Sequence, residues 1–318
     1  MALPEISFVI PLYNEAENFE TLIRRLDELM STLPFAAEVV LIDDGSKDNT
    51  TLLMHSIAEG DPRYVCVFLS RNHGHQLALA AGMKYARGGR AIMMVDGDLQ
   101  DPPELIHEFL PFLDQGYEVI YGVRRKRKES MVKRFAYWAY YRIMTKIANI
   151  DLPLDTGDFA LVSRRVINLL NKMPERNRYL RGMRTWIGFK QIGVEYDRFG
   201  RNAGTTKYSF GKLMSLALSG IYNFSDLPIR IMTYLGGFAI GSSLIYLITV
   251  LYKKFFWGNV PTGFTATIII LIFFGGVQMI AMGILGEYVL RIYRESQQRP
   301  LFIVDKVIQD QEEISNQG

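Results

Sequence analysis

Two carboxylates with the spacing of a divalent-cation site follow an apolar run in the first third of the chain. Asp96 and Asp98 are separated only by Gly97 and come directly after residues 91–95. Aspartates two residues apart beyond a strand can bind one hard divalent ion and leave coordination positions for the phosphate oxygens of a substrate. We therefore predict a Mg²⁺ or Mn²⁺ site here. Such an ion would stabilise the charge that develops on a departing diphosphate.

Three other apolar runs also end in polar turns. Their sequences are Pro-Leu-Tyr-Asn-Glu at 11–15, Asp-Asp-Gly-Ser-Lys-Asp-Asn-Thr at 43–50 and Ser-Arg-Asn-His-Gly at 70–74. Any one of them could simply cap the following helix or form a turn. Four such turns on one sheet edge instead indicate a binding cleft. Neither a P-loop sequence nor a Gly-x-Gly-x-x-Gly fingerprint is present, which excludes the common nucleotide folds that use those loops.

The elements that must position these turns alternate between strands and helices. We expect strands at 6–11, 37–42, 65–69, 91–95 and 118–121, and helices at 17–33, 49–59, 76–86 and 103–115. This order predicts βαβ units on a mostly parallel sheet. Ligands of such sheets bind beyond the carboxyl ends of the strands, where the polar turns lie.

Composition limits the remaining classes. The 318 residues carry 36 Lys+Arg against 33 Asp+Glu, and 49% apolar with 22% charged residues exclude a disordered chain. A single cysteine excludes an internal disulfide and a zinc site built on several cysteines. The N-terminal residues lack a signal peptide, so we expect most of the chain in the cytosol.

Two uncharged runs, 231–252 and 264–286, are each long enough to cross a bilayer. Two spans return the chain to its starting side, and flanking arginines favour cytosolic termini. We expect a cytosolic domain at 1–229, a two-helix membrane domain at 230–290 and a cytosolic tail at 291–318. Two core helices of a soluble protein are the alternative. Small residues in both runs allow close helix approach and a homo-oligomer.

Two further segments, near 128–150 and 208–224, mix aromatic and aliphatic residues with Lys and Arg. This mixture suits a helix lying among lipid headgroups, and a core helix with a basic outer face is the alternative. The basic run at 124–128 favours anionic lipids as partners over nucleic acid. His73 and His75 lack metal-ligand spacing, and we interpret both as polar turn residues.

The ordered series of turns resembles the inverting, GT-A-fold glycosyltransferases of family 2. The match continues through Thr-Gly-Asp-Phe-Ala-Leu at 156–161, Arg-Asn-Ala-Gly-Thr-Thr-Lys-Tyr at 201–208 and the two spans. This set is similar to the polyisoprenyl-phosphate glycosyltransferases, which include polyprenyl-phosphate glucosyltransferases and dolichol-phosphate mannose synthases. The resemblance implies a Rossmann-like α/β GT-A fold with interfacial helices and two C-terminal transmembrane helices.

The resemblance also implies a role for each matching residue. The nucleotide-sugar pocket would be lined by Pro11, Tyr13, Glu15, Asp43, Asp44, Ser46, Arg71 and Asp96. Asp98 would hold the metal and the diphosphate, Asp96 would contribute to the metal, and Gln100 would complete its coordination. Asp158 matches the catalytic-position carboxylate, either as a base or as a group that orients the acceptor or sugar.

The phosphate of the acceptor needs fixed positive charge beside the diphosphate of the donor. Arg124 just beyond a strand, and Arg201 and Lys207 on a glycine-containing loop, are the candidates, because arginine gives bidentate contacts and lysine a compact charge.

Together these features predict transfer of one hexose, with glucose from UDP-glucose favoured, to a polyisoprenyl phosphate such as undecaprenyl phosphate at the cytosolic membrane face. Alternatives are another donor (GDP-mannose, UDP-GlcNAc or an aminoarabinose donor), another lipid acceptor, or a non-enzymatic module that binds or helps translocate lipid-linked sugar. Processive polymerases of this fold carry Gln-x-x-Arg-Trp and more spans. Residues 181–186 lack that spacing, which favours a single transfer. The absence of an endoplasmic-reticulum retention signal favours a bacterial inner membrane.

Overall fold

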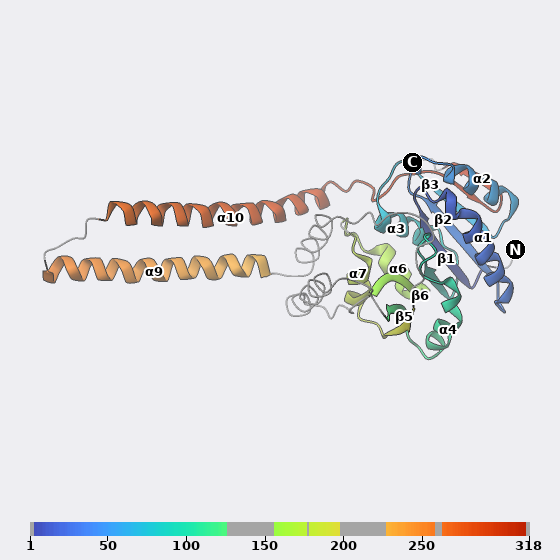
Figure 1. The fold of residues 1–318 in the computed structure, drawn as a ribbon, viewed down its shortest axis with the longest axis horizontal. Helices are drawn as coiled ribbons and strands as arrows, with labels where there is room; N and C mark the ends of the chain where they lie inside the picture. Colours follow the sequence, from blue (N-terminus) through green and yellow to red (C-terminus); the bar gives the residue numbers. More distant parts are fainter. Residues whose placement is uncertain (1–2, 126–155, 177, 198–226, 258–262, 316–318) are drawn as a thin grey trace. The chain divides into compact units, whose positions relative to one another are not determined.

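The computed structural model describes residues 3–125, 156–176, 178–197, 227–257 and 263–315 (Figure 1). The chain divides into two compact units, one of residues 1–142, 150–208 and 299–318, the other of residues 143–149 and 209–298. The expected interfacial segments near 128–150 and 208–224 lie outside the described residues, as do Arg201 and Lys207.

One sheet forms the centre of the first unit. Among the described residues it has nine strands in the order β7-β5-β6-β4-β1-β2-β3-β8-β9. The strands β4, β1, β2 and β3 are mutually parallel, and β5 pairs with β7 in parallel, while β6, β8 and β9 pair antiparallel. The mostly parallel central sheet predicted from the alternating pattern is therefore confirmed. The strands are β1 (Ile6–Leu12), β2 (Ala37–Asp43), β3 (Tyr64–Leu69), β4 (Ala91–Met94), β5 (Val119–Arg124), β6 (Thr156–Ser163), β7 (Gln191–Tyr196), β8 (Val304–Gln309) and β9 (Glu312–Ser315).

Helices cover both faces of this sheet. One face carries α1 (Ala16–Thr32), α2 (Thr50–Gly60) and α4 (Ile106–Asp114), the last preceded by the 3₁₀ turn η1 (Pro103–Leu105). The other face carries α3 (His75–Tyr85), α6 (Arg164–Lys172) and α7 (Leu180–Ile187). Each face has its own apolar cluster, so the strands are sandwiched between two cores.

The sequence explains these elements directly. All seven residues of β1 are buried, because a parallel strand covered on both faces needs a continuous apolar run. In contrast, α1 buries Phe19, Leu22, Leu26 and Leu29, whose spacing of three or four residues forms one stripe. The nine elements predicted between residues 6 and 121 are all present, with ends that shift by three residues at most.

The C-terminal segment differs from our expectation. We predicted a tail over residues 291–318, but α10 continues to Ser296, and residues 304–315 form β8 and β9 of the sheet. Strand β8 pairs antiparallel with β3, the edge of the parallel part, and its Val307 and Ile308 are buried. Short strands with charged positions such as Asp305 and Lys306 do not show a clean apolar alternation, which is why the sequence pattern did not reveal them.

The second unit contains two long apolar helices, α9 (Leu227–Trp257) and α10 (Phe264–Ser296), which contact each other. Within them, Ile231–Lys253 and Phe273–Ser296 are long and apolar enough to cross a membrane. Large apolar side chains on both helices, including Phe238, Leu247, Leu271 and Met279, are exposed within the structure. The first of these segments agrees with the run predicted at 231–252, whereas the second ends ten residues beyond the run predicted at 264–286.

Candidate active site

The turns that follow β1 and β2 are tied to each other. The backbone N–H of Asn14 donates to Ser46 Oγ at 3.0 Å, and the N–H of Lys47 donates to Asn14 Oδ1 at 2.7 Å. The N–H of Glu15 donates to Thr50 Oγ1 at 3.0 Å. Parallel strands end at the same edge of the sheet, where these hydrogen bonds hold the two turns side by side. The two sequence motifs therefore form one continuous surface.

Asp43 and Asp44 are both 3% exposed and fix the local backbone. Asp43 accepts from the N–H of Ser46 at 2.8 Å and from Thr51 Oγ1 at 2.6 Å. Each carboxylate oxygen of Asp44 accepts from the turn that follows β3, through the N–H of His73 at 2.6 Å and of Gly74 at 3.0 Å. Burial raises the pKa of Asp44, and the two N–H donors oppose this rise.

Two glycines allow the turns to approach closely. Gly45 has φ +68°, and a Cβ on it would lie 2.6 Å from backbone atoms of Arg71 and Asn72. A Cβ on Gly97 would lie 2.4 Å from Leu12 Cδ2, at the end of β1. Only glycine fits a left-handed or backbone-contacting position of this kind without strain. The Asp96–Asp98 turn is thereby seated over the end of β1.

The three residues predicted to bind the metal lie on one turn after β4. Asp98 Oδ1 accepts from the N–H of Gln100 at 3.2 Å, and Asp96, Asp98 and Gln100 are all partly exposed. Burial, together with the negative charges of Asp101, Asp98 and Asp158, raises the pKa of Asp96 to about 6, against the opposing charge of His75. The turn therefore concentrates negative charge that a cation would offset.

These donors suit Mg²⁺ or Mn²⁺. Carboxylate and amide oxygens are the ligands those ions prefer, and the ions usually take only one or two carboxylates plus substrate phosphates and water. No group of three His, Cys, Asp or Glu side chains that could enclose a metal occurs among the residues that the structure describes. A site of this composition would therefore be completed by the bound diphosphate.

Asp158 of β6 lies among polar and cationic side chains. Gln76 Nε2 donates to Asp158 Oδ2 at 2.6 Å, His75 Nε2 lies 3.6 Å from the same oxygen, and Arg181 Nε lies 3.5 Å from Oδ1. Burial alone would raise the pKa of Asp158, but Arg181, His75 and Arg184 hold it well below its usual range. Asp158 is therefore deprotonated at any pH near neutrality.

His75 connects the two acidic groups of the site. Its Nε2 lies 3.4 Å from Asp96 Oδ1 as well as near Asp158. Partial burial would lower the pKa of His75, whose side chain is 44% exposed, but its contact with Asp158 and the negative charges of both aspartates outweigh this and raise the pKa to about 9. Our interpretation of His75 as a polar turn residue was wrong, because it begins α3 between these carboxylates.

The backbone around Asp158 is fixed from α7. The buried Arg184 donates to the carbonyl oxygens of Asp158 at 3.3 Å and of Gly157 at 3.2 Å. Gln76 also accepts from the N–H of Leu180, the first residue of α7, at 3.0 Å. Strand β6, α3 and α7 therefore meet at Asp158.

The side chain of Arg124 binds two other residues of the protein. Its Nη2 contacts Asp101 Oδ2 at 3.2 Å and its Nε donates to the Tyr196 hydroxyl at 3.3 Å. The Tyr196 hydroxyl donates to Asp101, which is fully buried. A Cβ on Gly157 would lie 3.1 Å from Arg124 Nη2, which places the guanidinium beside the residue preceding Asp158. The predicted phosphate ligand thus lies near Asp158, with 18% of its side chain exposed.

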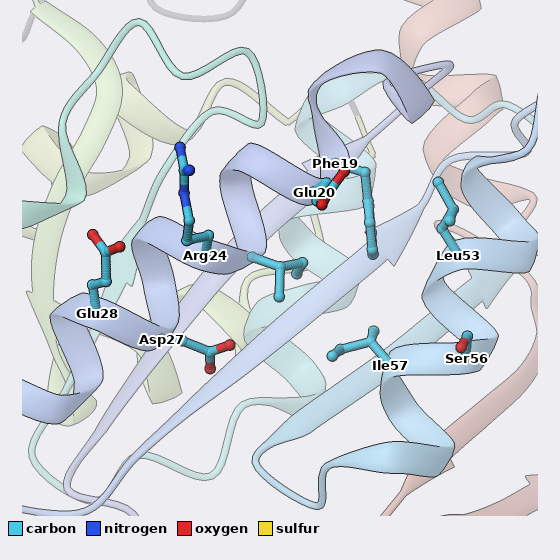
Figure 2. Close-up of a pocket in the computed structure, with 9 residues that line it drawn as sticks. Phe19, Glu20, Arg24, Asp27, Glu28, Leu53, Ser56 and Ile57 are labelled. Carbon is cyan, nitrogen blue, oxygen red and sulfur yellow. The ribbon is translucent and has the colours of Figure 1, made fainter.

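The remaining predicted residues lie on the same strand ends. Pro11 is buried in β1, Tyr13 and Glu15 are half-buried in the turn after β1, and Arg71 is exposed after β3. A separate groove of about 550 Å³ lies between α1 and α2, lined by Phe19, Ile23, Leu53 and Ile57 with charged residues at its rim (Figure 2). None of the predicted site residues lines this groove, so it is not the site described above.

Sequence reasoning missed Gln76, Arg181 and Arg184, and misread His75. His75 and Gln76 directly follow the turn at 70–74, so the rule that placed the strand-end turns could have included them. Arg181 and Arg184 are three residues apart and share a face of α7. No local pattern connects that helix with Asp158, because the contact depends on the tertiary fold.

Comparison with known proteins assigns the class. Residues 7–170, just over half of the chain, match Glycosyl transferase family 2, and the chain belongs to this family. The protein is a glycosyltransferase with a GT-A-like α/β fold, as the resemblance implied.

Curated relatives match over nearly the whole length. The chain is 41% identical over 303 residues to "Uncharacterized glycosyltransferase YkcC" of Bacillus subtilis, covering 95% of this chain and 94% of that protein. It is 38% identical over 308 residues to "Prophage bactoprenol glucosyl transferase homolog" of Escherichia coli, covering 95% and 99%. It is 36% identical over 302 residues to "Bactoprenol glucosyl transferase" of Shigella phage SfV, covering 94% and 98%.

Proposed function

We propose that this protein transfers a single hexose, with UDP-glucose as the favoured donor, to a polyisoprenyl phosphate such as undecaprenyl phosphate at the cytosolic face of a bacterial inner membrane. The observation that carries the proposal is that the Asp96–Asp98 turn, Asp158 and the linked turns after β1 and β2 lie at one edge of the sheet. Two apolar helices and relatives named for bactoprenol glucosyl transfer support a lipid acceptor.

The proposed reaction is a single displacement. An oxygen of the lipid phosphate forms a bond to C1 of the hexose while the bond from C1 to the diphosphate oxygen breaks. The nucleoside diphosphate leaves with the bonding electron pair, and the configuration at C1 inverts. Because a phosphate monoester loses its second proton near pH 6, about the value for phosphorylated side chains, the nucleophile needs no strong base.

The role that we assign to Asp158 is orientation of the sugar or the acceptor. Arg181, His75 and Gln76 keep its carboxylate ionised and fixed, which suits a hydrogen-bond acceptor better than a proton carrier. Groups held in the reacting geometry lower the barrier because less reorganisation remains in the transition state.

Binding of the charged partners is assigned to the other predicted residues. Asp98, with Asp96 and Gln100, would hold Mg²⁺ or Mn²⁺, which supplies charge neutralisation at the leaving diphosphate when bound. The turns bearing Tyr13 and Asp43 would hold the nucleotide. The remaining proposed ligands are Pro11, Glu15, Asp44, Ser46 and Arg71 for the nucleotide, and Arg124, Arg201 and Lys207 for the phosphate of the acceptor.

The metal assignment is tested by UDP binding to the detergent-purified chain, measured by titration calorimetry in EDTA and in Mg²⁺ or Mn²⁺. We expect the cation to strengthen binding by about tenfold or more, consistent with a charge pair near a diphosphate, and Asp98→Asn to lose this gain. Asp114→Asn, which changes an exposed aspartate on α4, is the matched control. Equal UDP affinity in EDTA and in cation would contradict the metal assignment.

The donor is tested separately with a panel of UDP-glucose, UDP-GlcNAc, GDP-mannose and an aminoarabinose donor. Lipid-dependent release of the nucleotide product with UDP-glucose alone is the expected result. Release with another member of the panel would replace glucose as the sugar while leaving the class of reaction intact.

A further inference from the structure

The segment that follows α10 returns to the functional edge of the sheet. Strand β8 is antiparallel to β3, and its first residue, Val304, pairs with Leu69 at the end of β3 where the polar turn at 70–74 begins. Residues 302–304 therefore lie beside that turn. The side chains of Phe302 and Val304 pack against the apolar cluster beneath α3.

The backbone of Ile303 both accepts a hydrogen bond from this turn and donates one to it. Its carbonyl oxygen accepts from the N–H of Ser70 at 3.0 Å, and its N–H donates to His73 Nε2 at 3.5 Å. The N–H groups of His73 and Gly74 in turn hold Asp44. A continuous chain of contacts thus runs from the returning segment through the β3 turn to the β2 turn.

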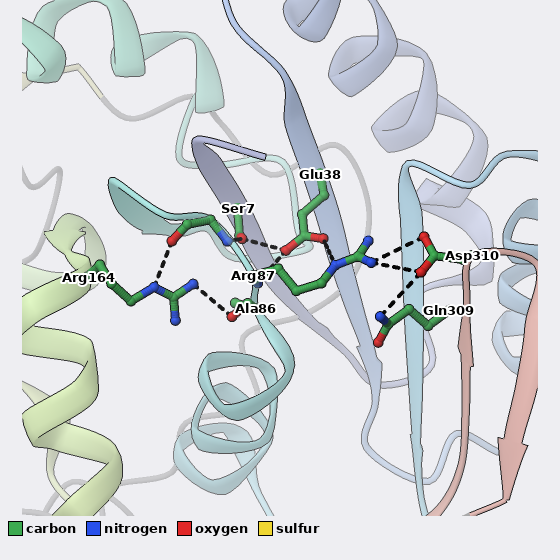
Figure 3. Close-up of polar contacts among 8 residues, drawn as sticks. Ser7, Glu38, Ala86, Arg87, Arg164, Gln309 and Asp310 are labelled. Carbon is green, nitrogen blue, oxygen red and sulfur yellow. Dashed lines mark hydrogen bonds and ion pairs between the residues drawn. The ribbon is translucent and has the colours of Figure 1, made fainter. Parts of the chain in front are cut away.

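The C-terminal end of β8 is anchored at the other end of the strands, near the start of β2. Asp310 in the β8–β9 turn binds Arg87 Nη1 at 2.9 Å, and Arg87 Nε donates to Glu38 Oε2 at 2.8 Å (Figure 3). Glu38 is 2% exposed and also accepts from Ser7 Oγ at 2.6 Å. Exposed ion pairs contribute little alone, but this one is joined to the buried Glu38 carboxylate, and removing a partner from a buried charge is costly.

The β8–β9 hairpin is thus attached at both ends, by Ile303 to the β3 turn and by Asp310 to Arg87. These contacts go beyond covering the exposed edge of β3. Covering that edge requires only the ladder between β3 and β8. The contacts of Ile303 lie beyond the ladder and reach the turn that carries Arg71 and holds Asp44. Gly45 of the β2 turn also packs closely against the backbone of Arg71 and Asn72, so the β2 and β3 turns are in direct contact.

We propose that the segment returning after α10 is a working part of the donor site, in which Ile303 positions the β3 turn and, through it, the β2 turn. His73 is then a positioning residue. It acts through its imidazole on Ile303 and through its backbone on Asp44. This inference rests on the proposed function, because the turns concerned are those assigned to the nucleotide.

The test is a double-mutant cycle on the full chain in detergent. His73→Ala removes the acceptor of the Ile303 N–H, and Ile303→Pro removes the N–H itself while keeping the carbonyl that binds Ser70. Loss of one hydrogen bond predicts UDP binding weaker by about two- to tenfold for each variant. Because both remove the same bond, the double variant is expected to bind as the weaker single variant does.

Three further measurements separate positioning from general damage to the fold. The KM for the donor should rise with kcat nearly unchanged, His73→Gln should restore much of the affinity through its amide oxygen, and His107→Ala should behave as the parent. Hydrogen exchange of the His73 and Gly74 amides should accelerate in both single variants. Unchanged exchange at these amides, or fully additive losses of affinity, would overturn the inference.

The exchange measurement also keeps the two proposals distinguishable. If the parent chain binds no nucleoside diphosphate, the proposed function fails, while faster exchange in His73→Ala and Ile303→Pro still supports positioning of the turn. If the parent binds UDP and both variants match it in affinity and exchange, the proposed function stands and the positioning inference is wrong.

Discussion

Asp158 shows how burial and neighbouring charge together define a residue. A buried carboxylate alone would gain a proton more readily, yet two arginines and a histidine shift the balance the other way. Gln76 then fixes its direction with a hydrogen bond of 2.6 Å. A carboxylate held in this manner is suited to accept a hydrogen bond throughout the reaction.

Asp158→Asn tests this role at the residue scale. The variant keeps the shape of the side chain and removes its charge, so we expect kcat to fall by about 100-fold, a typical loss for one electrostatic contact in a transition state. Steady-state transfer assays measure kcat, and calorimetry should give a UDP affinity within about twofold of the parent. Retention of more than half of the parent kcat would refute the role.

At the scale of elements, the site depends on turns that pack backbone against backbone. Gly45 lies in the left-handed region and meets the β3 turn at a distance that no Cβ can occupy. Strand β8 pairs with β3, and its first residue, Val304, lies beside the last residue of β3. The C-terminal hairpin therefore contacts the same β3 turn that Gly45 approaches.

Gly45→Ala should therefore separate the β2 and β3 turns. We expect a loss of about 1–3 kcal/mol in the free energy of unfolding, from the strained φ and the clash, and a weaker UDP affinity. Chemical denaturation and calorimetry measure the two effects. Gly116→Ala also has φ +82° but meets nothing within 4 Å, so it isolates the cost of φ alone. Equal behaviour of the two variants would show that the contact between turns is unimportant.

In the β8–β9 turn a substitution to glycine, the reverse of Gly45→Ala, is expected to stabilise the fold. Asp310 and Gln311 have φ +53° and +65°, as a two-residue hairpin turn requires, and glycine is the preferred residue at such positions. Gln311→Gly should raise the free energy of unfolding by about 0.5–1 kcal/mol, as relief of left-handed strain outweighs the loss of its bond to Glu59. Asp310→Gly gains the same freedom but loses Arg87, so it should be the less stable of the two in thermal denaturation. The reverse order would contradict the anchoring role of Asp310.

The sequence predicted the elements between residues 6 and 121 well, because each has one clear period and each turn a polar cluster. It also placed Asp96 and Asp98 in a turn after a strand. Asp158 was singled out only by the family resemblance, and the strand β6 that carries it was not predicted. It did not predict β8, whose alternation is interrupted by charge, or the contribution of α7, since Arg181 and Arg184 meet Asp158 only after the sheet has formed. Neither could spacing show that Arg124 binds Asp101, a partner 23 residues earlier.

At the scale of the whole molecule, a GT-A-like unit and a pair of apolar helices occur in one chain, and the chain crosses between them more than once. The returning segment after α10 completes the sheet, so the catalytic unit is not contiguous in sequence. A truncation before α9 would therefore remove β8 and β9 as well as both apolar helices.

Membrane association is expected to follow from α9 and α10. After alkaline carbonate extraction of cells that express the chain, we expect it to stay in the membrane pellet, because two spans bury far more apolar surface than a peripheral helix. Reporter fusions at the two termini should report the same compartment. Release into the supernatant by carbonate would show that the helices do not span a bilayer.

The central claim is hexose transfer to a lipid phosphate, and it is tested most directly by weighing the lipid product. Purified chain in detergent would be incubated with UDP-glucose, a short polyprenyl phosphate and Mg²⁺ or Mn²⁺, with Asp158→Asn as the control. We expect a polyprenyl phosphate heavier by one hexose residue, formed together with UDP and nearly absent with the variant. An unchanged lipid mass with every sugar donor tested, in a preparation that binds UDP, would contradict the claim.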